Sequence, residues 1–176
     1  MVASSTLYIG QTGHTPLGRL WVAVSQDGLV AVEGQMKREQ FEACLARRFS
    51  RAVEHAPDRI RAAAIQLEEY LSGRRRKFSL SIDWAGLRPF QQAALQATLA
   101  IPYGQMRTYH EIAVQIGHPR AARAVGRAEA TNPLPLVIPC HRVIGTDGKL
   151  HGYGLAGGSK AKEWLLKMES AGGVKV

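Results

Sequence analysis

Residues 108–130 read TYHEIAVQIGHPRAARAVGRAEA, and this stretch decides how the second half of the chain folds. Thr108 and Glu111 have the spacing of a capping box, which predicts the start of a helix, and Gly117 stands where that helix ends. Pro119 then opens a second, alanine-rich helix that continues to residue 130. Two short helices joined by a tight Gly-His-Pro turn predict a helix-turn-helix, with the second as the recognition helix.

The predicted recognition helix carries a basic stripe among small residues. Arg120, Arg123 and Arg127 recur at spacings of three and four, and Ala124 and Gly126 are too small to hold a partner at a distance. A DNA duplex could lie close against such a helix, although an alanine-rich helix with an ordinary charged face has the same pattern. Base readout needs long polar side chains, so DNA binding here would show little sequence preference.

Residues 133–143, PLPLVIPCHRV, place a thiol beside an imidazole. Neighbouring side chains of an extended segment point to opposite faces, so Cys140 and His141 need a bridging water or a local bend to interact. A thiol is mostly protonated at neutral pH, and His141 could act as its base through water, with a carboxylate to orient the ring. The plain alternative is a buried cysteine that neighbours a histidine by accident.

The first half of the chain reads as a sheet with helices. Apolar residues at near-alternate positions over 6–34 predict an antiparallel meander. Helices are expected over 37–49, with Cys44 packed on the apolar face, and over 58–71. Residues 78–84, FSLSIDW, alternate again and predict a strand that closes the sheet.

The composition changes around residues 85–89, AGLRP, where we expect a domain boundary. The predicted domains are 1–85, a structural α/β domain, and 86–176, which carries the helix-turn-helix between helices at about 89–100 and 160–170. The fold class expected is therefore α+β, an N-terminal antiparallel sheet with helices followed by a helical domain.

The charge of the chain favours a polyanionic partner. Its 176 residues include 23 Lys and Arg against 14 Asp and Glu, a net charge of +9. From Ala85 onward there are 11 basic and 5 acidic residues, so most of the excess lies in the second half. A nucleic acid is the expected partner, and it should meet the C-terminal domain.

The two cysteines, Cys44 and Cys140, are too few for a disulfide framework or a zinc site of paired thiols. The N-terminus lacks the pattern of a signal peptide, and no segment approaches the roughly 18 apolar residues that a membrane span needs. We expect a cytoplasmic protein without a membrane partner.

Several stretches together resemble the O6-alkylguanine-DNA alkyltransferases, also called methylated-DNA–protein-cysteine methyltransferases. The most specific is NPLPLVIPCHRVIG at 132–145, preceded by RAARAVGRAEA and followed by KEWLLKMES. TPLGRLWVAVSQDGL at 15–29 and PFQQAALQATLAIPYGQMRTYHEIA at 89–113 extend the resemblance, which covers about 15–171.

The resemblance implies roles for the residues of the site. Cys140 would accept the alkyl group from O6 of a damaged guanine, His141 would be its base through water, and Glu169 would orient His141. Asn132 would be a hinge that ties the recognition helix to the active-site loop. Tyr109 would lie beside the flipped nucleotide and help to neutralise the leaving guanine.

The resemblance also implies how DNA is bound. Arg123 would enter the base stack and fill the space of the flipped nucleotide, with the recognition helix in the minor groove. The residues Arg120, Ala124 and Gly126 would lie against the duplex, and Thr146 would add a polar contact.

Further implications concern the whole protein. The N-terminal domain would be ribonuclease-H-like, no cofactor would be needed, and no metal is expected because the zinc-binding cysteines of some relatives are missing. The partner would be double-stranded DNA that contains alkylated guanine, repaired by a monomer that is consumed at one molecule per lesion. Acceptance of O4-alkylthymine and clustering along DNA stay open, and the connection after Tyr153 is about two residues longer than usual, which leaves the pocket lining there open.

Two other functions fit parts of the sequence. A thiol hydrolase could use Cys140, His141 and Glu169, but the basic helix-turn-helix would be unexplained. A DNA-binding regulator or a damage sensor without repair activity would explain the helix but would not need the thiol.

Overall fold

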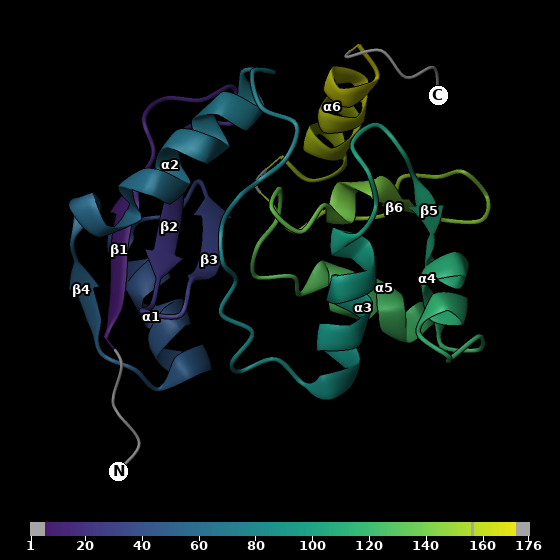
Figure 1. The fold of residues 1–176 in the computed structure, drawn as a ribbon, viewed down its shortest axis with the longest axis horizontal. Helices are drawn as coiled ribbons and strands as arrows, with labels where there is room; N and C mark the ends of the chain where they lie inside the picture. Colours follow the sequence, from purple (N-terminus) through teal and green to yellow (C-terminus); the bar gives the residue numbers. More distant parts are fainter. Residues whose placement is uncertain (1–5, 156, 172–176) are drawn as a thin grey trace. The chain divides into compact units, whose positions relative to one another are not determined.

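The computed structural model describes residues 6–155 and 157–171, and the chain divides into two compact units between Gly86 and Leu87 (Figure 1). Residues 1–5, 156 and 172–176, which the two predicted domains include, lie outside the described residues. The mixed composition of a sheet unit followed by a helical unit confirms the predicted α+β class.

The first unit is built on a sheet in the order β3-β2-β1-β4. Strands β1 (Leu7–Gln11), β2 (Leu20–Val24) and β3 (Leu29–Gly34) form the antiparallel meander that the alternating pattern predicted. Strand β4 (Val53–His55) pairs in parallel with β1 and was not predicted, because three partly exposed residues give no readable alternation. The sheet is therefore mixed at one edge.

Helices α1 (Arg38–Phe49) and α2 (Pro57–Leu71) cover the two faces of this sheet (Figure 1). On one face, Leu7 and Ile9 pack with Phe41 of α1 in a buried cluster. On the other face, a Cβ built at Gly10 would lie 2.7 Å from the Cγ1 atom of Ile60 in α2. Only glycine therefore allows α2 to approach β1 so closely.

Two predictions for the first unit are wrong. Cys44 is exposed and accepts a hydrogen bond from Arg47 at 3.4 Å, because the buried face of α1 follows Phe41 and Leu45 and leaves Cys44 outside. Residues 78–84 form no strand and contribute only an isolated bridge between Ile82 and Leu29.

The backbone around Ile82 is held by two hydrogen bonds to Leu29 and by a polar anchor next to it. The buried Asp83 carboxylate accepts hydrogen bonds from Ser25 at 2.7 Å and from Arg51 at 3.0 Å. These side-chain bonds anchor the segment next to its two backbone hydrogen bonds with Leu29, and the longer ladder that the alternation suggested does not form.

The second unit contains the predicted helix-turn-helix, formed by α4 (Tyr109–Gln115) and α5 (Ala122–Ala130). The capping box is present: Glu111 N–H donates to Thr108 Oγ1 at 3.1 Å, and Thr108 N–H donates to Glu111 Oε2 at 2.6 Å. Gly117 ends the first helix with a left-handed φ of 78°.

Helix α5 begins three residues later than predicted. Pro119 lies in a turn that Ala121 closes by donating its N–H to the His118 carbonyl at 2.8 Å. Arg120 is consequently outside the helix, and the predicted helical stripe keeps only Arg123 and Arg127.

The remaining helices frame this motif. Helix α3 (Pro89–Leu99) agrees with the expected range, whereas α6 (Gly158–Ala171) begins two residues earlier than expected. A buried cluster joins α3, α4 and α5 through residues that include Ala97, Ile112 and Val125.

A short parallel pair brings distant parts of the second unit together. Strand β5 (Arg107–Thr108) pairs with β6 (Val143–Ile144), with Thr108 opposite Ile144. Tyr109 follows β5 directly, and Cys140 precedes β6 by three residues. This pairing places both residues at the same end of the unit.

Candidate active site

Cys140, His141 and Arg142 form η1 (Cys140–Arg142), a single 3-10 turn. Cys140 N–H donates to the Ile138 carbonyl and Arg142 N–H to the Pro139 carbonyl, both at 2.8 Å. The prediction of an extended backbone at Cys140 is therefore wrong. The alternative, a local bend, is what the structure shows. Neighbouring side chains of a 3-10 turn point about 120° apart, so the thiol and the imidazole diverge even in the bend.

Asn132 holds the loop that leads into this turn. Its Nδ2 donates to the Ile138 carbonyl at 3.0 Å, and its Oδ1 accepts from Leu134 N–H at 2.9 Å. The side chain also lowers the pKa of the Cys140 thiol. Between these anchors Leu136 has a left-handed φ of 77°, a conformation that costs a non-glycine residue about 1 kcal/mol. Asn132 thus ties the end of α5 to the cysteine.

Glu169 of α6 binds the other two residues of the turn. His141 Nε2 lies 2.7 Å from Glu169 Oε1. The Arg142 guanidinium binds both carboxylate oxygens, with Nε at 2.9 Å from Oε2 and Nη2 at 2.9 Å from Oε1. Arg142 Nη1 donates to the Ile101 carbonyl at 2.6 Å, and Gly104 N–H donates to Glu169 Oε2 at 3.0 Å. The side chains of His141, Arg142 and Glu169 are all buried.

The network fixes the protonation of His141. Burial by itself would raise the pKa of Glu169, but the hydrogen bonds from His141 and Arg142 outweigh it and hold that pKa well below its usual range. Burial lowers the pKa of His141, and the bond to Glu169 opposes this only in part. The imidazole is therefore neutral at pH 7, and because an ionised carboxylate only accepts, Nε2 carries the proton.

The Cys140 thiol is protonated in the resting protein. Burial raises the pKa of Cys140 to about 12, and the Glu129 carboxyl adds to this effect. The Asn132 side chain and the positive charge of Lys162 act in the opposite direction and lower this pKa. A nucleophilic thiolate can form here only with a proton acceptor at hand.

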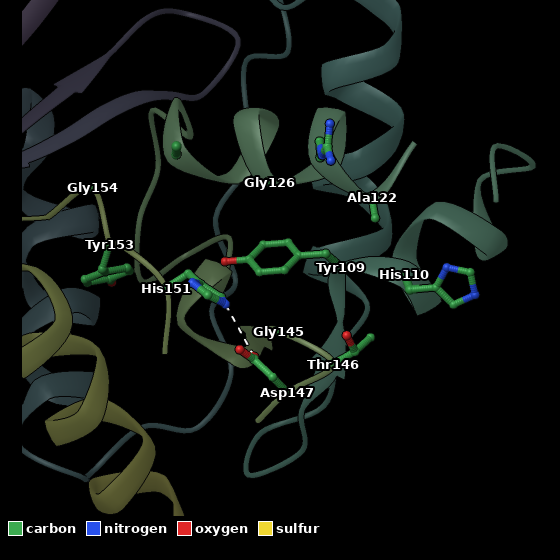
Figure 2. A pocket seen from close by; sticks show the side chains of 13 residues that line it. Tyr109, His110, Ala122, Gly126, Gly145, Thr146, Asp147, His151, Tyr153 and Gly154 are labelled. Carbon is green, nitrogen blue, oxygen red and sulfur yellow. Dashed lines mark ion pairs between the residues drawn. The ribbon is translucent and has the colours of Figure 1, made fainter. Parts of the chain in front are cut away.

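A pocket of about 670 Å³ opens beside these residues (Figure 2). The Tyr109 ring projects into it toward His151, with ring centroids 6.3 Å apart, and an ion pair of 3.4 Å joins His151 to Asp147. Tyr153 connects the pocket to the buried network, because its ring packs edge-on against His141 at 6.2 Å. The α5 residues that line the pocket are Ala122, Arg123, Gly126 and Ala130.

The Tyr109 hydroxyl keeps its proton at neutral pH. Burial, followed by the nearby Glu129 and Cys140, raises the pKa of Tyr109 to about 12. The hydroxyl is thus available as a hydrogen-bond donor inside the pocket.

The predicted site residues fall into two groups in the structure. Of the residues predicted to bind DNA, Arg123, Gly126, Thr146 and Tyr109 line the pocket. Arg120 and Ala124 are exposed and do not contribute to its wall. The residues predicted to carry out the alkyl transfer are buried behind the pocket. They are Cys140, His141, Asn132 and Glu169.

Three residues of the site were not among the predicted ones. Arg142 was quoted in the motif, but no role was assigned to it. Lys162 precedes Glu169 by seven positions on α6 and shares its buried face with Leu165, and Glu129 follows the buried Val125 by four positions on α5. Lys162 and Glu129 are charged residues at helix positions whose spacing from apolar residues predicts burial. This conflict is the sequence signal that could have identified them.

The described part of the chain shows neither a metal centre nor a membrane-spanning helix. Within residues 6–155 and 157–171, no group of three or more His, Cys, Asp or Glu side chains is placed to hold a metal ion. In the same part of the chain, none of the helices is long and apolar enough to cross a membrane.

Comparison with known protein families gives two matches. Residues 6–84 match the ribonuclease-like domain of 6-O-methylguanine DNA methyltransferase, and residues 89–171 match the DNA binding domain of the same family.

Individual relatives carry the same name. A methylated-DNA–protein-cysteine methyltransferase of Methanosarcina barkeri is 55% identical over 109 residues, which cover 62% of this chain and 67% of that protein. The protein of that name from Salmonella typhimurium is 40% identical over 161 residues, covering 88% of this chain and 91% of its own.

Solved structures agree over almost the whole length. The crystal structure of Mycobacterium tuberculosis O6-methylguanine methyltransferase has a TM-score of 0.77 at 35% identity, covering 94% of this chain and 93% of that one. Mycobacterium tuberculosis OGT in complex with DNA has a TM-score of 0.76 at 36% identity, with the same coverage. Together with the domain matches, these similarities show that the chain belongs to the methylated-DNA–protein-cysteine methyltransferase family.

Proposed function

We propose that this protein repairs DNA directly, as a methylated-DNA–protein-cysteine S-methyltransferase that moves the alkyl group from O6 of a guanine in duplex DNA onto Cys140. Membership of the family supports the reaction, and the buried contact between His141 and Glu169 next to the cysteine carries the assignment of residues. That contact supplies a neutral, oriented base beside a thiol that cannot ionise by itself.

The chemistry needs one proton acceptor and one proton donor. The Cys140 sulfur forms a bond to the alkyl carbon as the bond from that carbon to O6 breaks. Glu169 engages Nε2 of His141, so the thiol proton travels through an intervening water to Nδ1. The departing guanine gains negative charge, which the Tyr109 hydroxyl stabilises by donating a hydrogen bond, since its raised pKa keeps it protonated. The proton that His141 took from the thiol then passes to the guanine through water, so that both side chains return to their starting protonation states. The balance of atoms is complete without a cofactor.

The lesion has to leave the duplex to reach this site. A stacked base hides its O6 group, and rotating the nucleotide outward costs a few kcal/mol. The pocket of about 670 Å³ is large enough for a base, and Arg123 at its wall can fill the space left in the stack. Gly126 and Ala124 allow the close approach, and Arg120 and Thr146 contact the backbone of the DNA.

DNA is the partner that this account requires. The complex of the Mycobacterium tuberculosis relative with DNA supports it, as does the net charge of +9. A monomeric state and a cytoplasmic location stay predictions, whereas clustering along DNA and acceptance of O4-alkylthymine stay open.

The stoichiometry of the reaction tests the proposal. Transfer to carbon leaves a stable thioether, so each molecule acts once. Titrating a duplex that contains O6-methylguanine with increasing protein should remove one lesion per folded molecule and then stop. Repeated turnover would contradict the single-use acceptor, and a Cys140→Ala protein that still removes lesions would contradict the choice of cysteine.

A further inference from the structure

Glu129 is an acid buried at the end of α5, and the reaction described above does not use it. Its side chain is 5% exposed. The Thr98 hydroxyl of α3 donates a hydrogen bond of 2.6 Å to its Oε1. Among the described residues, Oε2 has no hydrogen-bond partner, although it is fully shielded from solvent. Only one oxygen of this buried carboxyl therefore has a hydrogen-bond partner among the described residues, and such a group needs an explanation.

Glu129 lies in a cluster with the groups that carry the reaction. Its carbonyl accepts the backbone N–H of Asn132 at 3.2 Å, and the Asn132 side chain donates to the carbonyl of Ile138, two residues before Cys140, at 3.0 Å. The titratable groups that act on Glu129 electrostatically are Cys140 of η1, Tyr109 of α4 and Lys162 of α6.

Lys162 provides the positive charge of this cluster. It is 1% exposed, and its Nζ donates to the carbonyl of Val143 at 2.6 Å and to that of His151 at 3.2 Å. The ammonium also lies 5.9 Å from the centroid of the Tyr109 ring. One buried cation thus faces two acids, the carboxyl of Glu129 and the thiol of Cys140.

The two acids compete for this cation. Burial raises the pKa of Glu129 to about 7, although Thr98 and Lys162 both favour its ionised form. Once ionised, Glu129 places a second negative charge near the sulfur and so disfavours the thiolate. When the carboxyl of Glu129 is neutral, the charge of Lys162 acts on the sulfur without an opposing carboxylate.

We propose that Glu129 is a positioning residue for alkyl transfer, which permits the Cys140 thiolate when its carboxyl is neutral and opposes the thiolate when its carboxyl is ionised. This role rests on the proposed transfer to Cys140. It makes the rate depend on pH through a group that never touches the lesion.

Glu129→Gln tests this role because glutamine keeps the shape and can still accept from Thr98, but cannot ionise. Single-turnover transfer from an O6-methylguanine duplex is measured for both proteins from about pH 6 to about pH 9. We expect similar rates at the acid end. At the alkaline end the variant should be roughly three- to tenfold faster, since one pKa unit changes the thiolate fraction tenfold. A ratio that stays constant with pH would mean a structural role and overturn the proposal.

Thr98→Val provides a second variant, because it removes the bond that favours the carboxylate. The pKa of Glu129 should rise, so the slow alkaline regime should begin at a higher pH than in the unmodified protein. An unchanged or lower onset would contradict the proposal.

A direct titration separates this proposal from the transfer reaction. In protein labelled with ¹³C-glutamate, the side-chain signal that disappears in Glu129→Gln should titrate near neutral pH, at about 7. A Glu129 signal that titrates in the ordinary range of a glutamate, about pH 4.3, would overturn the role of Glu129 whatever the rates are. Failure of the unmodified protein to transfer alkyl groups would instead overturn the proposed function.

Discussion

At the scale of single residues, Glu169 accepts hydrogen bonds from His141 and Arg142 together, so its replacement disturbs two buried neighbours. Glu169→Gln would leave the buried Arg142 guanidinium without a countercharge. We expect the free energy of unfolding to fall by about 3–5 kcal/mol, as is usual when one partner of a buried ion pair is removed. Urea denaturation measures it.

Glu163→Gln on the same helix is the matched control, because the ion pair of Glu163 with Lys167 is exposed. This variant should unfold at the same urea concentration as the unmodified protein. Equal effects of the two substitutions would show that the buried network adds nothing to stability.

The depressed pKa of Glu169 also predicts how stability depends on pH. Because the folded pKa lies below the unfolded one, the carboxylate stabilises the protein above the usual glutamate range, about pH 4.3, and this contribution is lost as the pH falls toward the folded value. Urea denaturation at a series of acid pH values should show this loss in the unmodified protein. The loss should be smaller in Glu169→Gln, and parallel curves would refute the assignment.

His141→Gln tests the base. The substitution should slow transfer by about 100-fold or more, because a thiol with a pKa of about 12 then lacks its acceptor. In the unmodified protein the rate should fall in acid as His141 becomes protonated, below its ordinary pKa, and this limb should be absent in the variant. An unchanged pH profile of the single-turnover rate would rule out His141 as the base.

The sequence allowed some of these residues to be predicted and not others. Cys140 and His141 stand together in one motif, and the resemblance supplied Glu169. The contact of Arg142 with Glu169 joins residues 27 positions apart. No local pattern encodes such a pair, so only the packed fold reveals it.

At the scale of elements, α5 offers two arginines in different settings. Arg123 lines the pocket, whereas Arg127 is exposed on the same helix and does not. Arg123→Ala should slow transfer from a duplex far more than transfer from the free base O6-methylguanine, because only the duplex requires flipping. Single-turnover rates on both substrates test this.

Arg127→Ala is the control for this comparison. Both variants lose one positive charge, so a general loss of affinity for DNA should appear in both. If Arg123 assists flipping, Arg123→Ala should lower the transfer rate from duplex at saturating DNA more than Arg127→Ala does. Identical rates for the two variants would exclude the flipping role of Arg123.

Elements that are determined locally were predicted well. The capping box at Thr108 and Glu111 acts within four residues, and α4 starts where it indicates. The 3-10 turn at Cys140 and the segment around Ile82 are held by anchors elsewhere in the chain, Asn132 in one case and Ser25 with Arg51 in the other. Local alternation could not show either.

At the scale of the whole molecule, the basic charge predicts binding that depends on salt. Cys140→Ala keeps the charge and the recognition helix, so it should bind duplex DNA with an affinity that falls steeply as salt increases, because phosphate contacts release counterions. Fluorescence anisotropy at several salt concentrations measures the slope. An affinity independent of salt would contradict a surface that holds the DNA backbone.

The most direct test of the account is the location of the transferred group. Cys44 is exposed and Cys140 is buried, so chemical methylation of accessible thiols would modify Cys44 first. After incubation with an O6-methylguanine duplex, mass spectrometry of the digested protein should find one methyl group, on the peptide that contains Cys140. A methyl group on the Cys44 peptide, or none on folded protein, would contradict the assignment of Cys140 as the acceptor.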